Sequence, residues 1–141
     1  MRVTAKFHYA LIILIELALN QGENGIKQKD LSDRLHISLK FLDPIVSALK
    51  TSGIIYRVPI FKVGGYRLTC DPGEITVYKV YCSFEPELNI HYCLIDGIEC
   101  TRSTFCGSHY FMDKMNKEME SSMLSSTIKD LADLQKQRDI N

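Results

Sequence analysis

The sequence lacks any apolar run long enough to cross a membrane. Its most hydrophobic stretch, residues 10–19, is interrupted by Glu16, whereas a membrane-spanning helix needs about twenty consecutive apolar residues. No small-residue cleavage site follows the stretch, as it would in a secretory signal peptide. We therefore expect a buried helix at this position and no membrane partner.

Catalytic motifs are missing as well. The chain contains no Ser-His-Asp set, phosphate-binding loop or pair of catalytic carboxylates in a recognisable pattern, which argues against an enzyme. Its five cysteines are an odd number for a disulfide framework. We therefore expect the protein to work in the reducing cytoplasm.

The chain has no net charge, but the two signs are unevenly placed along it. Residues 1–68 hold ten Lys and Arg against five Asp and Glu, and residues 69–141 hold seven against twelve. The front part is therefore +5 and the remainder −5. A basic front suits phosphate contacts, which supply most of the sequence-independent affinity for DNA. At 141 residues, 45% of them apolar, the chain can form one compact domain with an appendage.

Apolar spacing in the front part predicts three helices. The first covers residues 4–19, the second covers residues 27–35, and the third begins after Ser38, which is placed to cap it. Two short helices joined by a tight turn are typical of the helix-turn-helix. Pro44 lies inside the third helix, so this helix either starts nearer Leu42 or is kinked.

The N-terminal residues of the second helix in such a motif enter the major groove of DNA. We therefore place four residues near base edges and phosphates: Ser38, Lys40, Phe41 and Asp43. For Phe41, packing in the core is an equally good interpretation.

Beyond Gly53, residues 54–58 and 66–68 are expected to form two strands around a loop. Such a hairpin is a wing beside the helix-turn-helix. Four wing residues are assigned to DNA contact: Arg57, Lys62, Gly64 and Gly65. The apolar residues Ile60 and Phe61 at the tip would be unusual in a pure DNA contact and could pack on protein instead.

Four soft metal donors lie within seventeen residues of the acidic part: Cys93, Cys100, Cys106 and His109. Thiolates and imidazole suit iron–sulfur clusters and zinc, so the donor set alone does not choose the metal. The wide gaps between the cysteines favour a larger cluster over structural zinc. The alternatives are small apolar loop residues with His109 capping a helix, or a redox switch of bare thiols.

The rest of the acidic part predicts further helices. Asp71, Pro72 and Glu74 are placed to start a helix that continues through Tyr81. An apolar stripe between residues 111 and 134 predicts one long amphipathic helix, or two helices broken near the serines at 121–126. This stripe needs a partner, either the chain's own first helix or the same helix of a second subunit.

Three groups of residues carry a family resemblance. They are Met1-Arg2-Val3-Thr4 with Tyr9-Ala10 and Leu17-Ala18-Leu19-Asn20, then Ile37-Ser38 with Phe41-Leu42, and Gly64-Gly65-Tyr66-Arg67-Leu68. Together they resemble the bacterial winged-helix regulators that include IscR, NsrR and CymR, also called the Rrf-two family. The similarity runs from residue 1 to about residue 119. It implies a mainly α fold with a small β-hairpin wing, a long C-terminal dimerisation helix, and a homodimer on a nearly palindromic DNA operator.

The segment Cys106-Gly107-Ser108-His109 is similar to the cluster-binding branch of that family. The resemblance implies that Cys93, Cys100 and Cys106 are thiolate ligands of an iron–sulfur cluster, with His109 completing the site. A [2Fe-2S] cluster is the first expectation, and a [4Fe-4S] cluster, zinc or no cofactor are the alternatives. Two departures from the family pattern, at Pro44 and at Ile60 with Phe61, concern DNA reading.

These inferences divide the chain into a winged helix-turn-helix domain over residues 1–82, a cofactor-ligand loop over 83–109, and a dimerisation helix with a tail over 110–141. The expected function is transcriptional regulation in which the cluster controls operator affinity. A cluster-free winged-helix repressor or a dimeric adaptor with structural zinc is the alternative.

Overall fold

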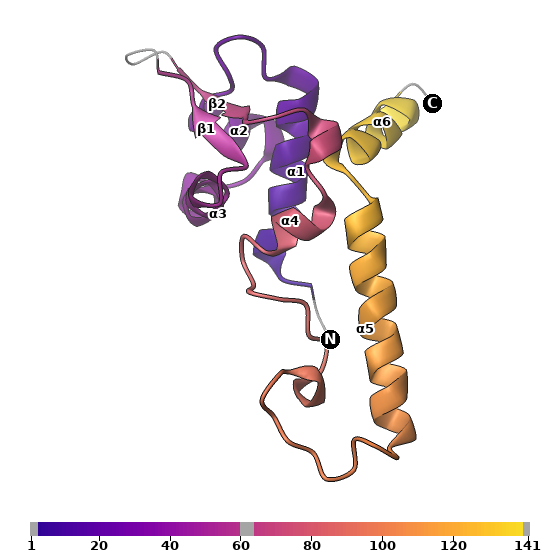
Figure 1. Cartoon of the computed structure of the whole chain (residues 1–141). Coiled ribbons are helices and arrows are strands. Elements are labelled where there is room, and N and C mark those ends of the chain that lie inside the picture. The colour runs from indigo at the N-terminus through magenta and orange to yellow at the C-terminus, as the bar shows by residue number, and fades with distance from the viewer. Residues whose placement is uncertain (1–2, 60–63, 140–141) are drawn as a thin grey trace.

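The computed structural model describes residues 3–59 and 64–139, and within them it is mainly helical with a two-stranded antiparallel sheet (Figure 1). In chain order the elements are α1 (Ala5–Asn20), α2 (Gln28–Leu35), α3 (Leu39–Thr51), β1 (Ile55–Arg57), β2 (Tyr66–Leu68), the 3-10 helix η1 (Pro72–Glu74), α4 (Val77–Tyr81), the 3-10 helix η2 (Tyr92–Leu94), α5 (Gly107–Ser125) and α6 (Ile128–Asp139). This confirms the expected fold class.

Helix α1 forms the centre of the core. Thr4 caps it, because its hydroxyl oxygen accepts a hydrogen bond from the Phe7 N–H at 3.3 Å. The side chains that α1 buries are Phe7, Ala10, Ile13, Leu14 and Leu17. The helix contacts α2, α3, α4, α6 and β2, so its dense apolar pattern is covered on several sides. None of the helices described is long and apolar enough to cross a membrane.

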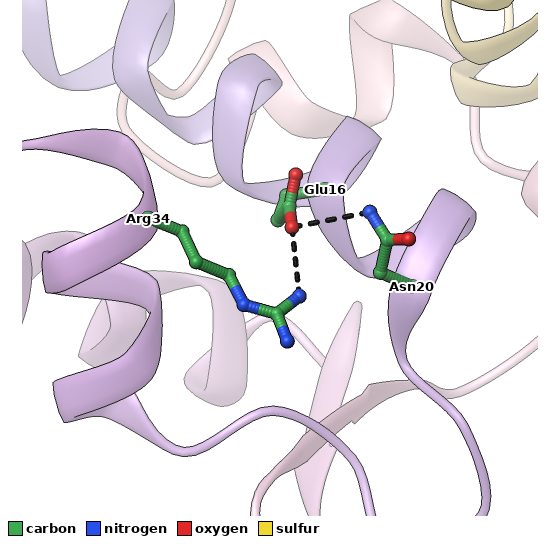
Figure 2. A network of polar contacts seen from close by, with 3 residues as sticks. All are labelled: Glu16, Asn20 and Arg34. Atoms are coloured by element: carbon green, nitrogen blue, oxygen red, sulfur yellow. Dashed lines mark hydrogen bonds and ion pairs between the residues drawn. The ribbon is translucent and has the colours of Figure 1, made fainter.

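Glu16 interrupts the apolar run because it holds α2 against α1. Its Oε1 accepts hydrogen bonds from Arg34 Nη1 at 3.0 Å and from Asn20 Nδ2 at 3.1 Å (Figure 2). The Glu16 side chain is 15% exposed and that of Arg34 is 49% exposed. Because one partner is half in water, we expect this ion pair to stabilise the fold by less than about 1 kcal/mol. The pair is a side-chain link between α1 and α2.

The turn between α2 and α3 follows from local chemistry. His36 ends α2 in the left-handed region, with φ 54°, and the Ser32 hydroxyl donates a hydrogen bond to the Ile37 carbonyl. Ser38 then caps α3, as predicted, by accepting the Phe41 N–H at 3.2 Å. The helix already begins at Leu39, so the suggested start near Leu42 is wrong. It continues through Pro44 to Thr51.

The helix predicted to start at Asp71 is replaced by two shorter elements. Asp71 caps only the 3-10 turn η1, and α4 starts later, where the Thr76 hydroxyl oxygen accepts the Lys79 N–H. Ile75 and Thr76 are extended because this segment pairs with residues 126–128. The Val77 N–H donates to the Ser126 carbonyl at 2.8 Å, and the Ile128 N–H donates to the Ile75 carbonyl at 2.9 Å. This long-range pairing overrides the local helix signal.

The C-terminal stripe forms two helices rather than one. Helix α5 runs alongside the globular body and extends beyond it, with the loop that precedes it curling beneath (Figure 1). The chain then turns at Ser126 and Thr127, and α6 packs on α1. Ile128 and Ala132 of α6 are buried. This part of the stripe is therefore covered by the chain's own first helix.

A capping box starts α6. The Thr127 N–H and hydroxyl both donate to Asp130 Oδ2 at 2.9 Å, and the Asp130 N–H donates back to the Thr127 hydroxyl at 3.2 Å. The hydrogen bonds from the Thr127 backbone and then from its hydroxyl lower the pKa of the Asp130 carboxyl below its ordinary value. These bonds favour the ionised carboxylate.

We expect the Asp130→Asn variant to lose stability less steeply than the wild type when the pH falls below about 4. A carboxyl whose pKa is lowered by folding stabilises the fold above its unfolded pKa, and this contribution disappears as the pH falls through its folded pKa. Urea midpoints between pH 2 and 7 would measure the difference. Asp133→Asn, on the exposed surface of the same helix, is the control. Parallel curves for wild type and Asp130→Asn would contradict the prediction.

Candidate nucleic-acid interface and ligand loop

The start of α3 presents the residues predicted to read DNA. Ser38, Lys40 and Asp43 are exposed. Gln28 of α2 donates a hydrogen bond from Nε2 to Asp43 Oδ1 at 3.1 Å, so the Asp43 carboxylate is held in place from the neighbouring helix. At the exposed start of α3, the Asp43 carboxylate can accept hydrogen bonds at base edges and the Lys40 ammonium group can donate them.

Phe41 has a packing role. Its ring meets the Tyr9 ring edge to face, with centroids 5.2 Å apart and an interplanar angle of 82°. The side chain is half-buried and packs against the core. The geometry therefore agrees with the packing interpretation, and the DNA contact predicted for Phe41 stays a prediction.

The wing is a short hairpin that is attached to the loop between α1 and α2. In the strands, Ile55 pairs with Leu68 and Arg57 with Tyr66. Tyr66 N–H donates to the Ile26 carbonyl at 2.8 Å, and the Ile26 N–H donates back to the Tyr66 carbonyl at 3.0 Å. This pairing fixes the wing against the body of the domain.

The glycine pair makes this attachment possible. Gly64 and Gly65 are buried, and the Gly65 N–H donates to the Asn24 carbonyl at 2.7 Å. An added Cβ on Gly65 would lie 2.4 Å from the Ile26 carbonyl carbon. The structure thus gives the pair a packing role at the base of the wing, whereas the DNA contact predicted for them stays a prediction.

A groove between α2 and the wing gathers positive charge. It is lined by Lys27, Gln28, Arg57, Gly64, Gly65 and Tyr66. Lys27 and Arg57 are exposed, and Lys27 stands at the N-cap of α2 without a side-chain cap. Lys62, also assigned to DNA contact, lies outside the described residues. Lys27 was not among the predicted DNA contacts, although it belongs to the basic excess of residues 1–68.

Cys106 and His109 lie together at the start of α5. Cys106 is the N-cap, and its Sγ accepts a hydrogen bond from the His109 N–H at 3.4 Å. The alternative in which His109 caps a helix is therefore wrong, because the cysteine does so. His109 Nδ1 is sealed from solvent and has no hydrogen-bond partner among the described residues. A sealed ring nitrogen of this kind needs a partner.

The other two cysteines lie apart from this pair along the loop. Cys93 is half-buried in η2, which contacts α5, and its N–H donates to His91 Nδ1 at 3.3 Å. Cys100 is exposed. Over residues 3–59 and 64–139, no three His, Cys, Asp or Glu side chains are grouped so that they could hold a metal ion. The three thiols are free.

Comparison with known proteins identifies the family. Residues 3–134 match the family model Rrf2, described as an iron-dependent transcriptional regulator. The chain belongs to the Rrf2 family. It is 30% identical over 122 residues to the HTH-type transcriptional regulator IscR of Aliivibrio salmonicida, covering 86% of this chain and 71% of that protein. It is 28% identical over 131 residues to IscR of Vibrio cholerae, covering 93% and 75%.

Solved structures of Rrf2 regulators share the fold. CymR, the global cysteine regulator of B. subtilis, superposes with a TM-score of 0.76 at 23% identity, over 95% of this chain and 98% of that one. T. potens IscR superposes with a TM-score of 0.73 at 23% identity, over 93% and 85%. As an Rrf2 member, the chain is a DNA-binding transcriptional regulator and not an enzyme.

The donors in this Rrf2 chain fit an iron–sulfur cluster in their chemistry. Three free thiols can supply thiolates, and the unpartnered His109 Nδ1 supplies a nitrogen lone pair. Cys106 and His109 are already fixed on one helical turn. The remaining two thiols lie on the loop that leads into this turn, so only the loop has to change shape to bring them in.

Proposed function

We propose that this chain is a dimeric regulator whose affinity for operator DNA is set by an iron–sulfur cluster held by Cys93, Cys100, Cys106 and His109. The observation that carries the proposal is the sealed, unpartnered Nδ1 of His109 beside the Cys106 thiol at the start of α5. A cluster at this site, with [2Fe-2S] as our first choice, would supply reversible redox chemistry and would be lost or altered by oxidants. Histidine in place of a fourth thiolate suits a labile, sensing site.

Helix α5 connects this site to a surface suited to a second copy of the chain. Its outward face carries exposed apolar residues, with Tyr110 73%, Phe111 55% and Leu124 48% exposed. Exposed apolar residues at this density are typical of an interface. We therefore assign this face to a two-fold dimer, in which two α3 helices would reach successive major grooves about one helical turn apart.

The proposed domains follow from this arrangement. Residues 1–82 would bind DNA and residues 83–109 would bind the cofactor, while α5 would supply the dimer contact. In the tail, α6 packs on α1 of its own chain. A DNA partner implies a cytoplasmic location.

The DNA side of the proposal rests on the exposed start of α3 and on the basic groove beside the wing. Lys27 and Arg57 both line that groove, and among the described residues no side chain caps the start of α2. A helix N-terminus beside two cations favours a phosphate. We therefore add Lys27 to the residues expected to touch the DNA backbone.

We expect the Lys27→Ala variant to bind DNA more weakly and with a shallower salt dependence. Each phosphate contact contributes about 0.9 to the slope of log affinity against log salt concentration, so losing one contact should reduce the slope by about one. Titrations of fluorescent genomic DNA fragments at several salt concentrations would measure it. Lys136→Ala, an exposed lysine of α6, should leave the slope unchanged. Equal slopes for Lys27→Ala and wild type would exclude the contact, and no binding by the wild type at low salt, with and without cofactor, would exclude the function.

The competing function is a cluster-free repressor or a dimer with structural zinc. The spread of the donors along the loop favours the cluster-free repressor, because a preformed metal site, structural zinc included, would gather them. Metal analysis separates the two proposals.

A further inference from the structure

We propose that Asn116 is a positioning residue that ties the start of the ligand loop to the middle of α5 and passes movement of the loop to that helix. By ligand loop we mean residues 83–109. The inference rests on the function proposed above, because it names the link through which cofactor binding would reach the dimer helix.

Both ends of the Asn116 amide are used on the loop. The Ile90 N–H donates to Asn116 Oδ1 at 3.0 Å, and Asn116 Nδ2 donates to the Leu88 carbonyl at 2.8 Å. The amide thus pairs with a backbone donor and a backbone acceptor two residues apart, as the edge of a β-strand would. Asparagine is a poor helix former, so its place in the middle of α5 is explained by this tertiary contact.

The two Asn116 hydrogen bonds, called the clamp below, hold residues 88–90, the segment that leads to Cys93. Leu88 is buried in the core and Ile90 packs partly against it. Cys93 follows three residues later in η2, which itself contacts α5. The ligand loop is therefore held by the same helix at two points, at Ile90 through Asn116 and at the N-cap through Cys106.

His109 and Asn116 are seven positions apart, so they lie on the same face of α5, about two turns from one another. Both side chains are half-buried, whereas Tyr110 and Phe111 are exposed. One face of the helix thus carries a proposed ligand and the clamp, and the proposed dimer surface lies on the face next to it. A loop that closes around a cofactor must either pull α5 through these two attachments or break the clamp.

Hydrogen exchange in the metal-free protein tests whether the clamp exists. In Asn116→Ala, exchange of the Ile90 amide should accelerate by about tenfold or more, because two hydrogen bonds that hold it closed are lost. Asn116→Asp keeps the size and the acceptor but loses the donor, and should give a smaller acceleration. Asn89→Ala is the matched control, since this neighbouring amide makes no side-chain hydrogen bond within the described part of the chain. An unchanged Ile90 rate in Asn116→Ala would overturn the proposal.

The ratio of operator affinities with and without the reconstituted cluster tests whether the clamp passes movement of the ligand loop to α5. For the wild type we expect a ratio of about 5- to 150-fold, the range of known allosteric couplings. Asn89→Ala should give the same ratio. Asn116→Ala should still bind DNA and iron, but its ratio should be near one. If Asn116→Ala showed faster exchange but an unchanged affinity ratio, the clamp would only stabilise the loop, and the proposed coupling to α5 would be overturned. A wild-type ratio of one would refute the cluster-controlled function and the coupling together, while the exchange result would still report on the clamp.

Discussion

Cys100→Ala is expected to lose its iron and acid-labile sulfide and to keep the fold of the wild type. Loss of a partner that only supports a metal ligand already reduces metal affinity by about 10- to 100-fold, so loss of a direct thiolate should reduce it at least as much. Cys100 is exposed and does not cap a helix, so its replacement leaves the apo fold intact. Visible absorption, iron, sulfide and zinc content of protein purified without oxygen would measure the effect.

Cys82→Ala is the matched control for this experiment. Cys82 is also an exposed free cysteine, but it lies at the end of α4, outside the four proposed ligands. It should keep the wild-type iron and sulfide content. A wild type that is colourless and holds zinc in proportion to the protein would instead support the structural site, and one without metal would support the cluster-free repressor.

The choice of Cys100 over Cys106 follows from the geometry. Cys106 accepts the hydrogen bond that starts α5, and capping groups contribute about 0.5–2 kcal/mol to helix stability. A Cys106 variant would therefore change the helix and the metal site at once. Cys100 separates the two effects.

Local signals in the sequence were sufficient for the helix-turn-helix. Ser38 directly precedes α3 and accepts the N–H of Phe41, three residues further along the chain, a relation visible without the fold. The buried spacing of Leu42, Ile45, Val46 and Leu49 is equally local. Strand and turn signals likewise predicted the hairpin of the wing. The family resemblance added the assignment of the four donors to an iron–sulfur cluster.

Long-range pairing was beyond such reasoning. Residues 71–74 resemble a helix start, and the extended conformation of Ile75 and Thr76 depends on partners at 126–128, which no local pattern shows. The same limit applies to the site. The sequence placed the four donors in one short segment, but the spread of the thiols along the loop and the hydrogen bonds of Asn116 depend on how the loop folds against α5.

Gly65→Ala is expected to be the most destabilising single-methyl change in the wing. The new Cβ would lie 2.4 Å from the Ile26 carbonyl carbon and 2.6 Å from the Lys27 nitrogen, and both are backbone atoms that cannot swing aside. The wing must then separate from residues 24–26 and lose hydrogen bonds such as Tyr66 N–H to the Ile26 carbonyl. Overpacking of this kind costs about 1–3 kcal/mol, and we expect the upper end because backbone pairing is lost as well.

Gly107→Ala is the control for this substitution, because a Cβ there meets nothing within 4 Å. At the first position of α5, alanine reduces the freedom of the unfolded chain and should stabilise the metal-free protein by about 0.4–1 kcal/mol. Urea denaturation of both variants therefore tests whether the same added methyl group lowers the free energy of unfolding in Gly65→Ala and raises it in Gly107→Ala. If Gly65→Ala unfolded at the wild-type midpoint, the close contact between the wing and residues 24–26 would not exist in solution. If it unfolded earlier, its operator affinity should fall as well, because Arg57 and Lys27 line one groove only while the wing stays attached.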